Sequence, residues 1–257
     1  MSDSFQPVTP LLAPCKCCGT TANLFGVVDF SKNCNTRLIR PLPLAGIPIY
    51  YHRCPNCQFI FTVAFDDFTP DDFSRHIYNE EYIKVDPDYK EARAKANAEF
   101  LAQTFGATKN VRMLDYGGGA GLLAAELRRA GFTNVETYDP FVAEHAALPD
   151  KKYELIVSFE VLEHSPNPQS TIESMNSLLD NPGLILFTTM LQQPTINQEG
   201  VNWWYAGPRN GHVSLYSQKS LSLLTQKYRF YFGSMHDGLH LLWREMPSCA
   251  AHLIQTN

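Results

Sequence analysis

Apolar residues along this chain recur with two different periods, and each change of period marks the boundary of a predicted element. From Val111 to Leu114 they form a short unbroken run, which predicts a buried strand. From Leu122 to Phe132 they follow helical spacing, and Gly131 supplies a helix stop. Glycines fill the interval between the two segments. The sequence therefore predicts a strand, a glycine turn and a helix, in that order.

The segments that follow continue the alternation of strands and helices. We expect a second strand that ends at Asp139 and a buried central strand at Leu155–Val157. The interval between them is so short that any helix or strand within it must be vestigial. The pattern next predicts a helix over 170–180, followed by Asn181, Pro182 and Gly183 and a strand over 184–190. A closing hairpin over 228–244 is expected to turn near 236–238. This order indicates an α/β fold with a mostly parallel sheet flanked by helices.

The residues before Asn110 have a different character. Short strands and turns are expected over residues 1–65, whereas residues 66–108 favour helices. Thr69 or Asp71 can cap a first short helix, and a second has apolar residues at helical spacing, at Tyr89, Ala92, Ala96 and Phe100. We therefore divide the chain into a small β module (1–65), a helical lid or linker (66–108) and the α/β domain (109–257).

Length and composition suit one α/β domain with a small appendage. The chain has 257 residues, of which 44% are hydrophobic and 12% aromatic. No apolar run is long enough to cross a bilayer, and the N-terminus does not resemble a signal peptide, so we expect a cytoplasmic protein without a membrane partner. A net charge of -5 without a basic block disfavours nucleic acid and favours a small-molecule acceptor. The oligomeric state cannot be read from the sequence.

The cysteines form two close pairs near the N-terminus. Cys15 and Cys18 make one C-x-x-C pair, and Cys54 and Cys57 make the other. In a reducing compartment such pairs bind zinc through four thiolates, because two cysteines in one tight turn chelate an ion together. Four protein ligands leave no open position, so we predict a structural zinc in a zinc-ribbon-like module. Buried thiols or disulfides are the alternative. The roles of Cys17, Cys34 and Cys249 stay open, and Cys17 could replace Cys15 or Cys18 as a ligand.

The glycine turn carries the first candidate chemistry. Glycine stands at Gly117, Gly119 and Gly121, just after Asp115. Without Cβ atoms in the way, a ligand can approach the backbone at the carboxyl end of the strand. The carboxylate of Asp115 would repel a pyrophosphate, but it would attract a ligand that carries ammonium and sulfonium groups. No GKS or GKT follows, which argues against a phosphate-binding loop of the Walker kind.

This pattern resembles the first motif of the Rossmann-like (class I) methyltransferases that depend on S-adenosylmethionine (SAM), and the resemblance runs from about Asn110 to about Arg244. It implies that SAM is the cofactor and that Asp139 accepts hydrogen bonds from both ribose hydroxyls. Asp150 is a candidate for contact with the adenine. The full set of expected cofactor-binding residues is Asp115, Tyr116, Gly117, Gly119, Gly121, Asp139, Phe159 and Glu160.

The segment from Glu160 to His164, reading EVLEH, follows the central strand and resembles the small-molecule O-methyltransferase and quinone-pathway branch of that family. In some methyltransferases such a segment and a later histidine hold a divalent ion that orients the acceptor hydroxyl. Here the ligands would be Glu160, Glu163, His164 and His212, a set that suits zinc, manganese or iron better than magnesium. Alternatively, the glutamates cap the following turn and His164 packs near the cofactor. We expect Glu163, His164 and His212 to be catalytic, with either histidine as the candidate general base.

The remaining candidates concern the acceptor. Trp203, Trp204 and Tyr205 form an aromatic cluster that suits either an exposed acceptor surface or a core or interface. Arg209 could hold a phosphate or carboxylate, and Tyr78 and Tyr82 are lid candidates, although a structural role is also open to each.

A four-cysteine module before such a domain is similar to the arrangement in the sugar C-methyltransferases that act on nucleotide-linked deoxysugars. We therefore expect methyl transfer to an oxygen or carbon of a small metabolite, with a saccharide or nucleotide-sugar intermediate as one candidate. RNA modification, with the zinc module gripping the nucleic acid, is an alternative function. A non-catalytic scaffold that uses the same fold is another.

Overall fold

The computed structural model describes residues 10–35, 42–88 and 91–254. The chain divides into two compact units, each assembled from three stretches of sequence. The first unit comprises Met1–Pro87, Leu162–Thr171 and Met190–Leu224, and the second comprises Asp88–Val161, Ile172–Thr189 and Thr225–Asn257. The division into segments 1–65, 66–108 and 109–257 remains a prediction, because the two units are defined by contacts within each unit rather than by position along the chain.

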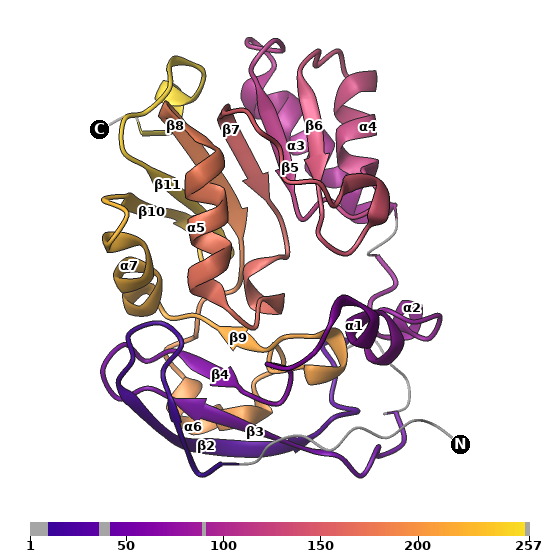
Figure 1. The fold of residues 1–257 in the computed structure, drawn as a ribbon, viewed down its shortest axis with the longest axis vertical. Coiled ribbons are helices and arrows are strands. Elements are labelled where there is room, and N and C mark those ends of the chain that lie inside the picture. Colours follow the sequence, from indigo (N-terminus) through magenta and orange to yellow (C-terminus); the bar gives the residue numbers. More distant parts are fainter. Residues whose placement is uncertain (1–9, 36–41, 89–90, 255–257) are drawn as a thin grey trace. The chain divides into compact units, whose positions relative to one another are not determined.

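The second unit is built on a six-stranded sheet, in the order β10-β11-β8-β7-β5-β6 among the described residues (Figure 1). Its strands are β5 (Met113–Tyr116), β6 (Val135–Tyr138), β7 (Tyr153–Ser158), β8 (Leu179–Thr188), β10 (Tyr231–His236) and β11 (Leu239–Trp243). Strands β6, β5, β7 and β8 run parallel, whereas β11 is antiparallel to both β8 and β10. The α/β fold, the mostly parallel sheet and the closing hairpin are therefore confirmed.

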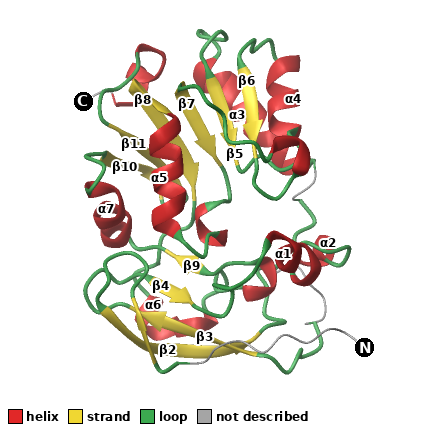
Figure 2. Ribbon diagram, viewed as in Figure 1, coloured by secondary structure: helices red, strands yellow, loops and turns green. Residues whose placement is uncertain are grey.

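Burial on both faces explains the apolar runs in the central strands. Every residue of β5 is buried, and β7 is buried except at Glu154. The helices that alternate with these strands are drawn in red in Figure 2: α3 (Ala92–Phe105), α4 (Leu122–Arg129) and α5 (Pro168–Leu178), the last of which begins in the first unit. Leu101 of α3 and Leu127 of α4 pack in one core cluster with Val157 of β7. This packing fixes the strand ends at which the glycine turn lies.

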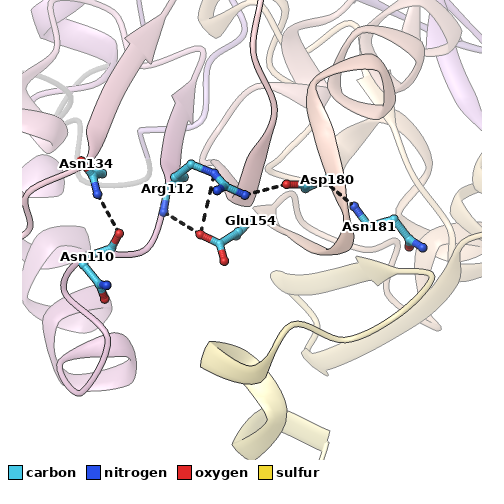
Figure 3. Close-up of polar contacts among 6 residues, drawn as sticks. All are labelled: Asn110, Arg112, Asn134, Glu154, Asp180 and Asn181. Carbon is cyan, nitrogen blue, oxygen red and sulfur yellow. Dashed lines mark hydrogen bonds and ion pairs between the residues drawn. The ribbon is translucent and has the colours of Figure 1, made fainter.

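Polar and charged residues link the amino ends of the parallel strands (Figure 3). The glycine turn lies at the other end of β5, between that strand and α4. Arg112, just before β5, donates from its backbone to Glu154 of β7 at 3.1 Å and from its guanidinium to Asp180 of β8 at 2.6 Å. Beside it, the Asn134 amide donates to the Asn110 carbonyl at 2.8 Å. The two carboxylates and Arg112 are about half exposed, so each ion pair contributes little, roughly 0.2–1 kcal/mol.

Two details of the second unit bear on the sequence predictions. The interval after Asp139 contains only a short 3-10 turn, η1 (Ala143–His145), among its described helices and strands, as its length indicated. The segment 181–183, expected between the helix and the strand, lies within the bounds of β8, which begins at Leu179. The segment forms an irregularity in the register, because Tyr153 of β7 pairs with Leu179 and Leu155 pairs with Leu184. The Gly183 backbone there donates to the Glu245 carbonyl at 3.0 Å.

The first unit is built on a five-stranded antiparallel sheet, in the order β1-β2-β3-β4-β9 among the described residues. Its strands are β1 (Leu12–Pro14), β2 (Thr21–Asp29), β3 (Pro48–Arg53), β4 (Ile60–Thr62) and β9 (Ser214–Leu215). The first cysteine pair lies in the turn between β1 and β2, and the second lies between β3 and β4. The fifth strand comes from far along the chain, which the sequence analysis did not foresee.

Short helices surround this sheet: α1 (Pro70–His76), α2 (Tyr82–Val85), α6 (Ile196–Glu199) and the 3-10 turns η2 (Leu162–His164), η3 (Gly200–Asn202) and η4 (Pro208–Asn210). Helix α7 (Gln218–Gln226) begins in this unit, and η5 (Ser248–Ile254) belongs to the second. Thr69 caps α1 as predicted, whereas Tyr89 lies outside the described residues. None of the helices in the described ranges has the length and apolar character to cross a bilayer.

The aromatic cluster at 203–205 belongs mainly to the core. Trp203 is 1% exposed and Tyr205 is 3% exposed, and both pack with Tyr51 and Leu215 in the core cluster of the first unit. Only Trp204 of the three is exposed. Of the two alternatives left open for this cluster, the core role therefore holds for Trp203 and Tyr205, which pack in the core of the cysteine-bearing unit.

Removing the hydroxyl of Ser217 should destabilise the protein. This buried side chain accepts a hydrogen bond from the Ser220 backbone at 3.0 Å at the start of α7, and it donates to the Cys57 carbonyl at 2.9 Å. Ser217→Ala should lower the free energy of unfolding by roughly 1–2 kcal/mol in a urea titration. Ser222→Ala, in the exposed part of the same helix, is the control and should change it by less than about 0.5 kcal/mol. Equal effects would contradict the capping role.

Candidate active site

The glycine turn connects β5 to α4 and has the left-handed backbone that glycine permits. The φ angles are 76° at Gly117, 55° at Gly119 and 75° at Gly121. A Cβ at Gly117 would lie 2.4 Å from the Val161 side chain, and one at Gly118 would lie 2.1 Å from Asp115 Oδ2. At Gly119 no described atom lies within 4 Å of that position. The turn is thus tightly packed on its inner side and open where a ligand would approach.

Asp139 directly follows β6, and the backbone holds its carboxylate in place. Gly119 N donates to Oδ2 at 2.8 Å, and Phe141 N donates to Oδ1 at 2.8 Å. A carboxylate has about four lone-pair sites, so both oxygens can still accept hydroxyl groups of a ligand. The structure therefore links the predicted ribose-binding acid directly to the glycine turn.

Asp115, the last acid before the turn, is almost completely buried. Burial, and to a lesser extent the negative charge of Asp139, raise the pKa of Asp115 to about 7. Its Oδ2 has no hydrogen-bond partner among the described residues. Buried polar atoms are nearly always satisfied, so this oxygen fits a ligand that brings a donor or a positive charge, as the amino-acid part of SAM does.

Three more residues were predicted to bind the cofactor. Tyr116 is buried with its ring 5.2 Å from that of Tyr138, and burial raises its pKa to about 12. Phe159 packs partly buried against the core of the second unit. Glu160 has a φ of 56°, unusual for a residue with a side chain, and its carboxylate accepts from Thr188 Oγ1 at 3.1 Å. Strained backbone of this kind is enriched at functional sites.

Asp150, the candidate for adenine contact, follows β6 in the chain and is not part of the glycine turn. It lines a cavity of about 430 Å³ beside β6, together with Glu136, Thr137 and His145. The ring of His145 also approaches the turn, because a Cβ at Gly121 would lie 3.1 Å from its Nε2.

In the first unit the four predicted zinc ligands come together, and their sulfur atoms lie within 4.8 Å of one another. Cys15 Sγ lies 3.5 Å from Cys57 Sγ, and Cys18 Sγ lies 3.5 Å from Cys54 Sγ. Tetrahedral zinc with bonds of about 2.3 Å separates its sulfurs by about 3.8 Å, whereas a disulfide bond measures about 2.05 Å. All four cysteines are free thiols. Their arrangement fits a closed zinc site and excludes disulfides between them.

A second cluster in the first unit joins Glu163, His164 and His212, whose ligand atoms also lie within 4.8 Å of one another. Glu163 is fully buried and His212 is 5% exposed. The two imidazole rings meet edge to face at 4.9 Å. One carboxylate and two imidazoles form a common three-ligand set for transition metals, which leaves positions for an acceptor. The fourth predicted ligand, Glu160, is not part of this cluster.

The backbone holds this cluster together. Glu163 and His164 lie in η2, and the Glu163 carbonyl accepts from Val213 N at 2.8 Å. His212 comes just before β9, and its carbonyl accepts from Tyr51 Oη of β3 at 2.6 Å. His212 is thus anchored to a strand that leads into the second cysteine pair.

The other candidates have structural partners. Arg209 donates to the Ile77 carbonyl and to the Asn79 side chain, so its guanidinium is engaged within the first unit. Tyr78, a lid candidate, has its ring 6.1 Å from that of His164 and 5.2 Å from that of Tyr82.

The three remaining cysteines stand in different surroundings. The Cys17 thiol donates to the Ser220 carbonyl at 3.7 Å, and it is not one of the four clustered ligands. Cys34 Sγ lies 3.4 Å from His212 Nδ1. Cys249 packs against the core of the second unit.

Comparison with known proteins places this geometry in a family. A family model described as a methyltransferase domain matches residues 89–231. The chain belongs to this methyltransferase-domain family. The predicted resemblance is therefore confirmed, and the glycine turn and Asp139 both fall inside the matched region.

Two curated O-methyltransferases are similar to part of this chain. A ubiquinone biosynthesis O-methyltransferase of Salmonella arizonae is 28% identical over 130 residues, covering 42% of this chain and 51% of the relative. One from Escherichia coli O7:K1 is also 28% identical over 130 residues, covering 42% and 52%. The chain spans about half the length of these curated relatives. Among solved structures, that of the mitomycin 7-O-methyltransferase MmcR aligns with a TM-score of 0.50 at 12% identity, covering 70% of this chain and 61% of that one, and so shares its fold.

Sequence reasoning missed the residues that contact and position the candidate site residues. Gly118 must lack a side chain because it lies against Asp115, although only the alternate glycines suggested a role. Tyr205 donates to Glu163 at 2.6 Å, whereas the sequence drew attention to it only as part of an aromatic run. No local pattern pairs Tyr51 with His212, so that contact could not be inferred.

The pKa of Asp115 predicts how SAM affinity depends on pH. Below pH 7 the side chain takes up a proton and loses the charge that attracts the cationic end of SAM. The affinity should therefore fall by about tenfold between pH 7.5 and pH 6 and level off above pH 7.5, as measured by calorimetry. In Asp115→Asn the affinity should be weaker and nearly independent of pH over this range. A wild-type affinity that does not change with pH would contradict the prediction.

Zinc should accompany the purified protein at about one ion per chain, as measured by elemental analysis. Cys54→Ser should lose this zinc and unfold at lower urea concentration, because the ion links two turns of one sheet. Cys249→Ser, at a cysteine outside the cluster, should keep the zinc. A Cys54→Ser protein with the wild-type zinc content would contradict the assignment.

Proposed function

We propose that the chain is a SAM-dependent methyltransferase that acts on a hydroxyl group of a small metabolite. The observation that carries this proposal is the open glycine turn, with the buried Asp115 behind it and Asp139 hydrogen-bonded to it, in a member of the methyltransferase-domain family. The named activities of the partial relatives, which are O-methyltransferases, support oxygen as the acceptor atom.

The residues of the second unit would hold the cofactor. Asp139 would accept the ribose hydroxyls, Asp115 would balance the positive charge of the amino-acid end, and the turn backbone would lie against the ligand at Gly119. Bound SAM supplies an electrophilic methyl group on sulfur. Because such transfer is an in-line displacement, much of the rate comes from alignment, and these residues contribute by fixing the cofactor's position.

We propose that Glu163, His164 and His212 bind a divalent cation, with zinc, manganese and iron favoured over magnesium by the two imidazoles. Such a cation would bind neighbouring hydroxyl groups and lower their pKa. Saccharides and nucleotide-linked sugars carry such hydroxyl pairs and fall within this acceptor class. If no cation binds, His164 or His212 takes the role of general base. The cytoplasmic location stays a prediction.

Asp139→Ala tests the cofactor assignment. The loss of two hydrogen bonds to a charged group should weaken SAM binding by roughly a hundredfold or more in calorimetry. Asp180→Ala is the control, since it removes an acid at the opposite ends of the strands, and SAM affinity should stay unchanged. Methyl transfer from tritiated SAM to catechol as the probe acceptor, with added Mn²⁺, tests the reaction. The absence of SAM binding in the wild type would refute the function.

A further inference from the structure

Tyr205 contacts two of the three cluster residues through different parts of its structure. Its hydroxyl donates to Glu163 Oε1 at 2.6 Å, and its backbone carbonyl lies 2.8 Å from His212 Nδ1. Its ring also meets the His212 ring edge to face at 4.2 Å. With 3% of its surface exposed, Tyr205 makes these contacts away from bulk water. Both contacts are therefore stronger and more directional than they would be in solvent.

The directions of these hydrogen bonds follow from their partners. Met190 N donates to the Tyr205 hydroxyl oxygen at 3.2 Å, so the hydroxyl hydrogen is directed to Glu163, which accepts it as a carboxylate. A carbonyl oxygen can only accept, so the hydrogen of a neutral His212 is on Nδ1. The lone pair of that imidazole is then on Nε2.

The Tyr205 carbonyl is itself held firmly. Lys32 Nζ donates to two carbonyls of the same turn, that of Trp203 at 2.8 Å and that of Ala206 at 2.7 Å. The Ala206 backbone closes a turn onto the Trp203 carbonyl at 3.1 Å. A Cβ at Gly207 would lie 2.5 Å from Cys34 Sγ, so the chain that leaves this turn is tightly packed. Tyr205 thus projects its carbonyl and its ring from a rigid, buried turn.

We propose that Tyr205 is the positioning residue of the Glu163, His164 and His212 cluster. It orients the Glu163 carboxylate through its hydroxyl and fixes the His212 tautomer through its carbonyl, so that both present lone pairs to a cation. This inference rests on the cation site of the proposed function. Groups that orient metal ligands in this way typically contribute 10–100-fold to metal affinity.

Mn²⁺ binding to the full chain, followed by electron paramagnetic resonance, tests the hydroxyl contact. Tyr205→Phe should weaken Mn²⁺ binding by about tenfold or more while SAM affinity stays the same. Tyr216→Phe is the matched control, because Tyr216 is equally buried but its hydroxyl donates to the backbone carbonyl of Leu162 at 3.0 Å. It should leave Mn²⁺ affinity within about twofold of the wild type. Equal losses in the two variants would refute a specific role for Tyr205.

A double substitution separates positioning from a general loss of packing. If Tyr205 acts through the carboxylate, adding Tyr205→Phe to Glu163→Gln should cause little further loss of Mn²⁺ affinity. Full additivity of the two losses would overturn the proposal, even if Tyr205→Phe is less stable.

The His212 tautomer can be measured without any ligand. In the chain labelled with ¹⁵N-histidine, magnetic resonance should assign His212 as the form protonated on Nδ1, with His212→Gln identifying its signals. Protonation on Nε2 would refute the carbonyl contact. Wild-type protein that binds SAM but not Mn²⁺ would remove the cation site and the positioning role and leave SAM-dependent transfer standing. Protein that binds Mn²⁺ but not SAM would refute only the transferase function.

Discussion

The position of His212 is set by the sheet that bears the four cysteines, which holds the chain at His212 and just after it. Ser214 and Leu215 pair with β4, the strand that follows the second cysteine pair. Just before them, the His212 carbonyl accepts from Tyr51 in β3. The Val213 backbone then reaches Glu163. The candidate acceptor residues therefore depend on the N-terminal sheet for their positions. The N-terminal module, which the sequence suggested was a small appendage, therefore positions the proposed cation ligand His212.

Both candidate sites rely on a carboxylate that is removed from water. Asp115 lies behind the glycine turn with one oxygen unsatisfied among the described residues, and Glu163 is fully buried with a hydrogen bond from Tyr205. Burying a charge costs free energy unless an opposite charge or donors compensate. Each site thus has a built-in preference for a positively charged ligand. For Asp115 that ligand would be an organic cation, and for Glu163, with two imidazoles beside it, a metal ion.

The parts that the sequence predicted well are those set by local pattern. The run Val111–Leu114, the alternate glycines and Asp139 are close in sequence, and their spacing follows directly from strand and helix geometry. The four cysteines were also recognisable, because chelation by paired turns leaves a spacing signature. The family match over residues 89–231 includes the glycine turn and Asp139 but not the cysteines.

What the sequence could not predict depends on contacts between distant segments. Nothing around Ser214 indicates a strand, because its two residues gain that geometry only from β4. For Trp203 and Tyr205 the sequence leaves both a surface and a core role open, and only their packing with the N-terminal sheet decides between them.

The late arrival of β9 has a consequence for how the protein is made. Synthesis proceeds from the N-terminus, so β4 leaves the ribosome long before β9 exists, and all of β5 to β8 is made in between. During that time β4 is an open strand edge with unpaired backbone groups, which invites pairing with other chains. Closure of the first unit is therefore a long-range step, of the kind that slows folding. Early capture of zinc by the four cysteines would hold the nascent sheet in shape until its last strand is available.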